Sequence, residues 1–165
     1  MRRLVPLVAA ALLAGMFAAV QSASAAPGGT GCHIAGMAMF SKGLNTNAQN
    51  VTYKFTGKLD NCQSSGTSYS GATLTAKGKG ALSCGQGTSK GLAKVTWSNG
   101  KKSVVPYTTQ SFGALVVVQG TVKRGEFAGQ STLGVLAFEA NPPDCAGSGV
   151  KMANFDGFDG YGSYQ

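Results

Sequence analysis

Strict alternation of apolar and polar side chains is the feature that most constrains how this chain can fold. In the stretch VTYKFTGKL (51–59), threonine and lysine alternate with Val51, Tyr53, Phe55, Gly57 and Leu59. The stretch ATLTAKGKGAL (72–82) repeats the pattern. A period of two places one face of a strand against a core and the other in water, as in an antiparallel sheet. The alternation therefore predicts an all-β fold.

Turn signals divide the chain into eight expected strands. These span residues 33–41, 50–60, 71–83, 91–98, 101–108, 113–123, 126–139 and 149–156. The sharpest turn signal is Asn99-Gly100, the preferred pair for a two-residue type I′ hairpin. We expect a small antiparallel up-and-down barrel of about eight strands, in which the last strand pairs with the first. A two-sheet β-sandwich is the alternative.

Four cysteines provide a test of this topology. Following strand direction through the meander brings Cys32 and Cys62 to one end, and Cys84 and Cys145 to the other. A disulfide spans about 6 Å between Cα atoms, whereas strands of this length run roughly 25 to 35 Å. The meander therefore predicts the bonds Cys32–Cys62 and Cys84–Cys145. An even number of cysteines without a C-x-x-C pair is typical of an exported protein in an oxidising compartment.

The N-terminus has the features of a secretory signal peptide. Two arginines precede an apolar, alanine-rich run, and small residues at 23–25 provide a cleavage pattern. We expect residues 1–25 to be removed and the protein to be secreted, with a retained membrane anchor as the alternative. Beyond residue 25 we expect a flexible lead (26–31), a barrel or sandwich domain (32–158) and a flexible tail (159–165), without a transmembrane segment after processing.

Charge is unevenly distributed along the chain. The net charge is +8, and no acid lies between Asp60 and Glu126. On the expected second to fourth strands, the polar face carries a basic stripe formed by Lys54, Lys58, Lys77, Lys79 and Lys94. Such segregation predicts an anionic partner such as an envelope polymer, although exposed lysines also serve solubility. We expect no specific nucleic-acid partner.

A second candidate site is the barrel end that carries the Asn99-Gly100 turn. The expected topology gathers aromatic and basic side chains at this mouth, namely Trp97, Lys101, Lys102, Lys123, Arg124 and Tyr69. An aromatic and basic cluster suits a small anionic or aromatic ligand. The alternative is that Trp97 only fills the core and that the basic residues only mark turns.

Two short stretches contain residues that bind metals in other proteins. In CHIAGMAMF (32–40), His33 shares a strand face with Met37 and Met39, but stands about 13 Å from Met37 at roughly 3.3 Å per residue. In the C-terminal stretch, Asp156 and Asp159 resemble the start of a calcium loop whose remaining ligands are absent. We therefore expect neither a metal nor another cofactor.

The catalytic possibilities are few. The chain has one histidine and four cysteines that we expect to be bonded, and it lacks a G-x-S-x-G elbow and a glycine-rich phosphate loop. Glu126 and Glu139 differ in strand parity and are expected to face opposite ways. We expect a noncatalytic binding or cell-surface protein. A small extracellular enzyme acting on envelope or glycan substrates is the alternative.

The spacing of cysteines, glycines and aromatic residues resembles that of uncharacterised small secreted four-cysteine β-proteins of high-GC Gram-positive bacteria. The residues that carry the resemblance are Cys32, Tyr53, Phe55, Gly57, Leu59, Cys62, Gly78, Gly80, Cys84, Val95, Trp97, Gly100, Gly125, Phe127 and Gly129. This resemblance implies no function. The pattern of strand and turn residues around AKVTWSNG is also similar to that of the avidin family, whose secreted eight-stranded barrels line a biotin pocket with several tryptophans. Because this chain has only Trp97, biotin binding is not expected.

Overall fold

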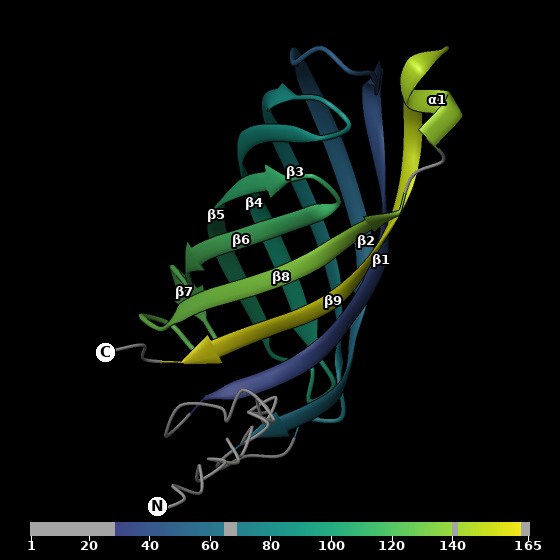
Figure 1. Ribbon diagram of the computed structural model, residues 1–165. Helices are drawn as coiled ribbons and strands as arrows, with labels where there is room; N and C mark the ends of the chain where they lie inside the picture. The colour runs from purple at the N-terminus through teal and green to yellow at the C-terminus, as the bar shows by residue number, and fades with distance from the viewer. Residues whose placement is uncertain (1–28, 65–68, 140–141, 163–165) are drawn as a thin grey trace, which may run out of the picture.

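The computed structural model describes residues 29–64, 69–139 and 142–162, which form a closed antiparallel β-barrel (Figure 1). Its eight barrel strands are β1 (Thr30–Leu44), β2 (Gln49–Ser64), β3 (Ala72–Leu82), β4 (Gln86–Trp97), β5 (Lys102–Phe112), β6 (Leu115–Thr121), β8 (Ser131–Glu139) and β9 (Val150–Gly162). A two-residue strand, β7 (Arg124–Gly125), pairs with β5. The helix α1 (Pro142–Ala146) lies between β8 and β9 in the chain. The expectation of a barrel rather than a sandwich is confirmed.

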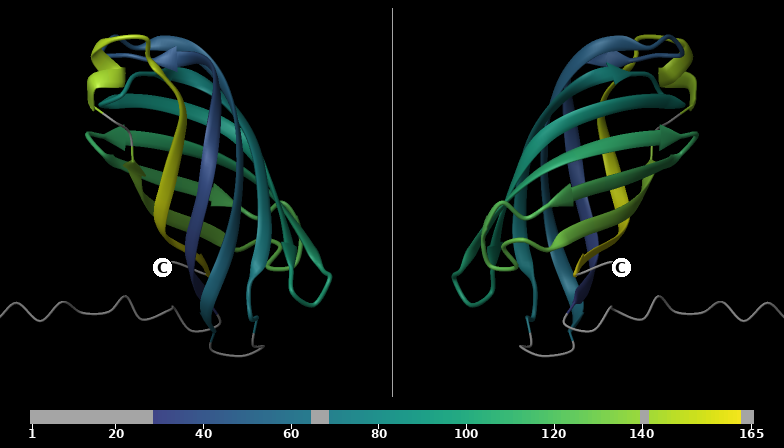
Figure 2. Two further views of the ribbon diagram at one scale, coloured as in Figure 1. Left: turned by 90° about the vertical axis from the view of Figure 1, so that its right-hand side faces the viewer. Right: turned by 90° about the vertical axis from the view of Figure 1, so that its left-hand side faces the viewer.

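Every barrel strand pairs with its neighbours in the chain, and the sheet closes on itself. The β4–β5 pairing joins the two halves of the meander, and β9 pairs with β1 along most of its length. This seam aligns Thr30 with Tyr161 at one end and Ala38 with Ala153 further along. The sequence-based expectation that the last strand pairs with the first is therefore confirmed. Figure 2 shows α1 at one end of the barrel and the end of β9 at the other.

Both disulfides have the expected pairing. Cys32–Cys62 links β1 to β2, with Cα atoms 4.0 Å apart. Cys84–Cys145 links the β3–β4 turn to α1 at the other end, with Cα atoms 6.0 Å apart. Two disulfides are typical of extracellular proteins, because the cytosol keeps thiols reduced.

Several boundaries differ from those expected. β9 continues to Gly162, so the domain extends past residue 158 and the expectation of a flexible tail was wrong for residues 159–162. β1 likewise begins at Thr30, within the expected lead. Residues 126–130 form a turn rather than the start of a strand, because Phe127 adopts a positive φ of 62° that an extended strand excludes. The expected signal peptide (1–25) lies outside the described residues, as do residues 163–165.

Inward-facing glycines shape the barrel wall on β3 and β4. A side chain at Gly78 would collide with the ring of Tyr53, and one at Gly91 would collide with the hydroxyl end of Tyr107. These two tyrosines therefore lie across the glycines inside the barrel, which explains why an apolar face carries residues without side chains.

In the described part of the chain, no helix has the length and hydropathy needed to cross a bilayer.

Candidate functional site

An aromatic plug fills the barrel end that was expected to be an open mouth. It consists of Tyr69, Trp97, Phe127 and Tyr161, whose neighbouring ring centroids lie 5.0 to 5.7 Å apart. Trp97 is 2% exposed and Tyr69 is 4% exposed. Strand parity turns Trp97 and Tyr161 inward, and the turn at 126–130 brings Phe127 against them.

Polar contacts hold this plug in place. The indole Nε1 of Trp97 donates to Ser103 Oγ at 2.9 Å, and Ser103 Oγ donates to the carbonyl oxygen of Glu126 at 2.6 Å. The Tyr69 hydroxyl donates to the Glu126 carboxylate, whose other oxygen lies 2.9 Å from Lys101 Nζ. The hydrogen bond from Tyr69, followed by that from Lys101, lowers the pKa of Glu126. Burial, followed by the contact with Glu126, raises the pKa of Tyr69 to about 12.

The expected mouth residues thus fall into separate groups. Trp97 and Tyr69 belong to the core, where they offer a ligand almost no surface. Lys101 is paired with Glu126, a contact that the sequence pattern did not indicate. Lys102, Lys123 and Arg124 remain exposed around the closed end. The aromatic and basic halves of the expected site are therefore not brought together around an open cavity.

The lysines of β2, β3 and β4 do converge, on the outer surface of the barrel. Lys54 lies directly opposite Lys77 across the β2–β3 pairing, and Lys79 lies directly opposite Lys90 across the β3–β4 pairing. All four side chains are exposed. We call these four residues the lysine face.

The lysine face surrounds a hollow in the outer surface. This hollow, of about 1250 Å³, is lined by all four lysines together with outward residues of β5 and β6 such as Thr108 and Gln119. Lys58 and Lys94, the other members of the expected basic stripe, lie opposite Thr73 and Thr75 and do not line it. Lys90 was missed because the fourth strand was expected to begin at residue 91, although the alternation continues through it.

No counter-charge neutralises the lysine face within the described residues. None of its four ammonium groups forms an ion pair with a described carboxylate. β3 and β4 contain no acid, and the acid of β2, Asp60, contacts His33 instead. Like charges opposite each other destabilise a sheet, so folding alone gives no reason for this arrangement.

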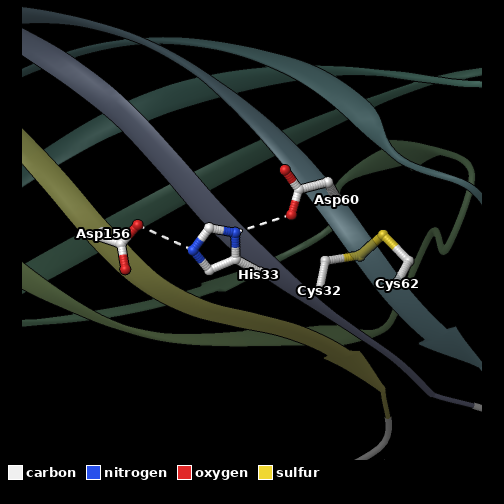
Figure 3. A network of polar contacts seen from close by, with 5 residues as sticks. All are labelled: Cys32, His33, Asp60, Cys62 and Asp156. Atoms are coloured by element: carbon white, nitrogen blue, oxygen red, sulfur yellow. Dashed lines mark hydrogen bonds and ion pairs between the residues drawn. A yellow bond between two sulfur atoms is a disulfide. The ribbon is translucent and has the colours of Figure 1, made fainter.

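The single histidine lies between two carboxylates on the outer surface (Figure 3). His33 Nδ1 is 2.8 Å from Asp60 Oδ1 on β2, and His33 Nε2 is 2.9 Å from Asp156 Oδ2 on β9. The hydrogen bonds to Asp60 and then Asp156 raise the pKa of His33. With both ring nitrogens occupied, the imidazole has no free lone pair for a metal ion or for general-base chemistry.

The other suspected metal ligands are also dispersed. Met37 and Met39 are exposed on β1, away from the His33 contacts with Asp60 and Asp156. Asp156 points outward to His33, whereas Asp159 points inward to Thr132, because residues three apart on a strand face opposite ways. Among the described residues, no group of three or more His, Cys, Asp or Glu side chains is arranged to hold a metal ion.

Comparisons with protein-family models, curated proteins and solved structures find no match to this chain. The assignment of a function therefore depends on the geometry of its own residues.

Proposed function

We propose that this chain is a secreted, noncatalytic binding protein whose lysine face holds an anionic polymer of the cell envelope. The observation that carries the proposal is the pair of facing lysines, Lys54–Lys77 and Lys79–Lys90, around one hollow. A linear polyanion can place successive negative groups against successive strands, which lie about 4.8 Å apart.

Electrostatics supports this assignment over simple solubility. Each facing pair of like charges disfavours the folded sheet by up to about 1 kcal/mol, and a bound polyanion would reverse the sign of that contribution. Solubility alone would be served equally well by lysines placed opposite threonines, as Lys58 and Lys94 are.

Two further features support a noncatalytic, extracellular role. The histidine is held by carboxylates at both nitrogens, and Glu126 is held by Tyr69 and Lys101. The expected signal peptide and the two disulfides are consistent with secretion.

Retention on isolated envelopes of the producing cells tests the proposal. The test variant changes Lys54, Lys77, Lys79 and Lys90 to Gln, and the matched control changes Lys42, Lys102, Lys123 and Lys151 to Gln. Both lose the same charge, and none of the four control residues lines the hollow. We expect wild type and control to be retained at low ionic strength and released as the salt concentration rises. The test variant should be released at a much lower salt concentration. By analogy with nucleic acids, the slope of the logarithm of the binding constant against the logarithm of the salt concentration should become shallower by up to about one unit for each lysine removed.

Equal retention of wild type and test variant would contradict the proposal. An equal loss in the test and control variants would also contradict it, because net charge rather than the lysine face would then govern binding.

A further inference from the structure

The barrel interior beyond the aromatic plug is only partly filled. A cavity of about 120 Å³ lies there, lined by residues from all eight barrel strands. Most of the lining is aliphatic or aromatic, and the small inward residues Ala76, Ala93 and Gly134 leave the space open. The cavity is somewhat smaller than the engineered apolar cavity of about 150 Å³ that holds benzene, so its ligand is limited to a body of about one ring.

The cavity extends toward the Cys84–Cys145 end of the barrel. Its lining runs from Tyr161 in the plug to Ser111 and Gly113 near the β5–β6 turn. Gly113 is exposed to solvent, so the lining reaches the surface at this end while the plug closes the other. The cavity is therefore separate from the mouth that the sequence pattern suggested.

One acid lies inside this apolar space. Among the described residues, Asp159 is the only carboxyl group on the cavity lining, and it is 9% exposed. Its Oδ1 accepts a hydrogen bond of 2.6 Å from Thr132 Oγ1. A Cβ atom at Gly134 would stand 3.2 Å from the same oxygen, so the glycine makes room for the carboxyl group.

Asp159 lacks a cationic partner within the described residues, where it forms no ion pair. Burial raises its pKa, against hydrogen bonds from Thr132, Tyr161 and the backbone of Gly160 that lower it. An unpaired buried charge is unfavourable unless a counter-ion reaches it. A cation inside the cavity would supply that counter-charge, whereas an anion would be repelled.

We propose that the barrel cavity binds a small amine with a one-ring or similarly sized apolar body, its ammonium group paired with Asp159 and its body against the apolar lining. The aromatic rings of the lining, Tyr161 included, add to the attraction for a cation. This site lies inside the barrel and takes a ligand of opposite charge from that of the lysine face. Either proposal can therefore fail without the other.

Isothermal titration calorimetry at neutral pH with three probes of one shape tests the inference. The probes are benzylamine, benzyl alcohol and benzoate, which are cationic, neutral and anionic. We expect benzylamine to bind wild type at least about tenfold more tightly than benzyl alcohol, and benzoate not to bind. In Asp159→Asn, which keeps the shape of the side chain, the affinities for benzylamine and benzyl alcohol should become equal.

A cavity-filling variant locates the binding. Ala76→Leu adds a side chain to the lining from β3, whereas Asp159 lies on β9, and should abolish binding of benzylamine and benzyl alcohol. Near-ultraviolet circular dichroism of the aromatic plug reports whether this variant keeps its fold. Failure of benzylamine to bind wild type at millimolar concentration would overturn the inference. So would equal binding of the amine and the alcohol by wild type, or an unchanged preference in Asp159→Asn.

Discussion

At the scale of single residues, His33 shows how a polar group can lie on a barrel surface and still bind strands together. It contacts Asp60 on β2 and Asp156 on β9, which are separated from it by 27 and 123 residues in the chain. The ring also makes an edge contact with Phe158, 6.0 Å away between centroids. His33 therefore links three neighbouring strands across the seam where the barrel closes.

This contact should make stability depend on pH. Because the folded protein raises the pKa of His33, the contribution is fully present below the unfolded pKa of about 6.5 and is lost as pH rises through the folded value. We expect wild type to exceed His33→Gln in free energy of unfolding at about pH 6, and the difference to shrink toward about pH 9. Urea unfolding at several pH values measures it. A difference that stays constant or widens as pH rises would show that the imidazolium does not stabilise the seam.

At the scale of the strands, β3 and β4 carry a distinct set of residues on each face of the barrel wall. Outward, they carry Lys77, Lys79 and Lys90, and inward they carry glycines that receive tyrosine rings. Tyr53 Oη lies 2.9 Å from Ser89 Oγ and 2.9 Å from Tyr107 Oη, so the two rings also join hydroxyl groups across β2, β4 and β5. The volume of the inward-facing side chains of β3 and β4 therefore determines how closely the tyrosine rings can pack against these strands.

Adding one methyl group at Gly91 tests this arrangement. The new Cβ atom would collide with the carbonyl oxygen of Lys77 and with the Tyr107 hydroxyl, so we expect Gly91→Ala to lower the free energy of unfolding by about 1 to 3 kcal/mol. The control is Gly85→Ala, where no heavy atom lies within 4 Å and the change should stay within about 0.5 kcal/mol. Denaturant unfolding gives both values. Equal stability of the two variants would mean that the wall can relax around the added methyl group.

At the scale of the whole molecule, closure of the sheet brings the end of the chain into the core. Tyr161 on β9 packs against Trp97 on β4, with ring centroids 5.3 Å apart, although the sheet order separates these strands by β1, β2 and β3. The plug therefore exists only when the β9–β1 seam has formed. The last strand is part of the domain rather than an appendage to it.

Two alanine substitutions on β9 test the role of this strand. Tyr161 is 3% exposed and Phe158 is 71% exposed, so one side chain packs inside and the other faces water. We expect Tyr161→Ala to cost about 3 kcal/mol or more in free energy of unfolding, and Phe158→Ala less than about 1 kcal/mol. Thermal or urea unfolding compares them. A small effect of Tyr161→Ala would mean that the end of β9 adds little to the stability of the domain.

The fold was largely predictable, because its main signals are local. Alternation assigns a strand and the face of each residue, and the direction of successive strands decides which cysteines can meet. The candidate site was predictable only in part. The parity of Lys54, Lys77 and Lys79 was visible in the sequence, but their partners across each pairing were not.

Alternation and chain direction were enough to predict most of the strands, the meander and the two disulfides, since each depends on short periods or on the direction of successive strands. Which residues face one another across a pairing depends on the register, which is set only when the sheet forms. A slip of one residue in register turns every side chain of a strand to the other face. The β1–β9 register therefore places Asp156 beside His33 and turns Asp159 into the cavity, and the turn at 126–130 brings Phe127 into the plug. These contacts join segments far apart in the chain, and no local pattern encodes their alignment.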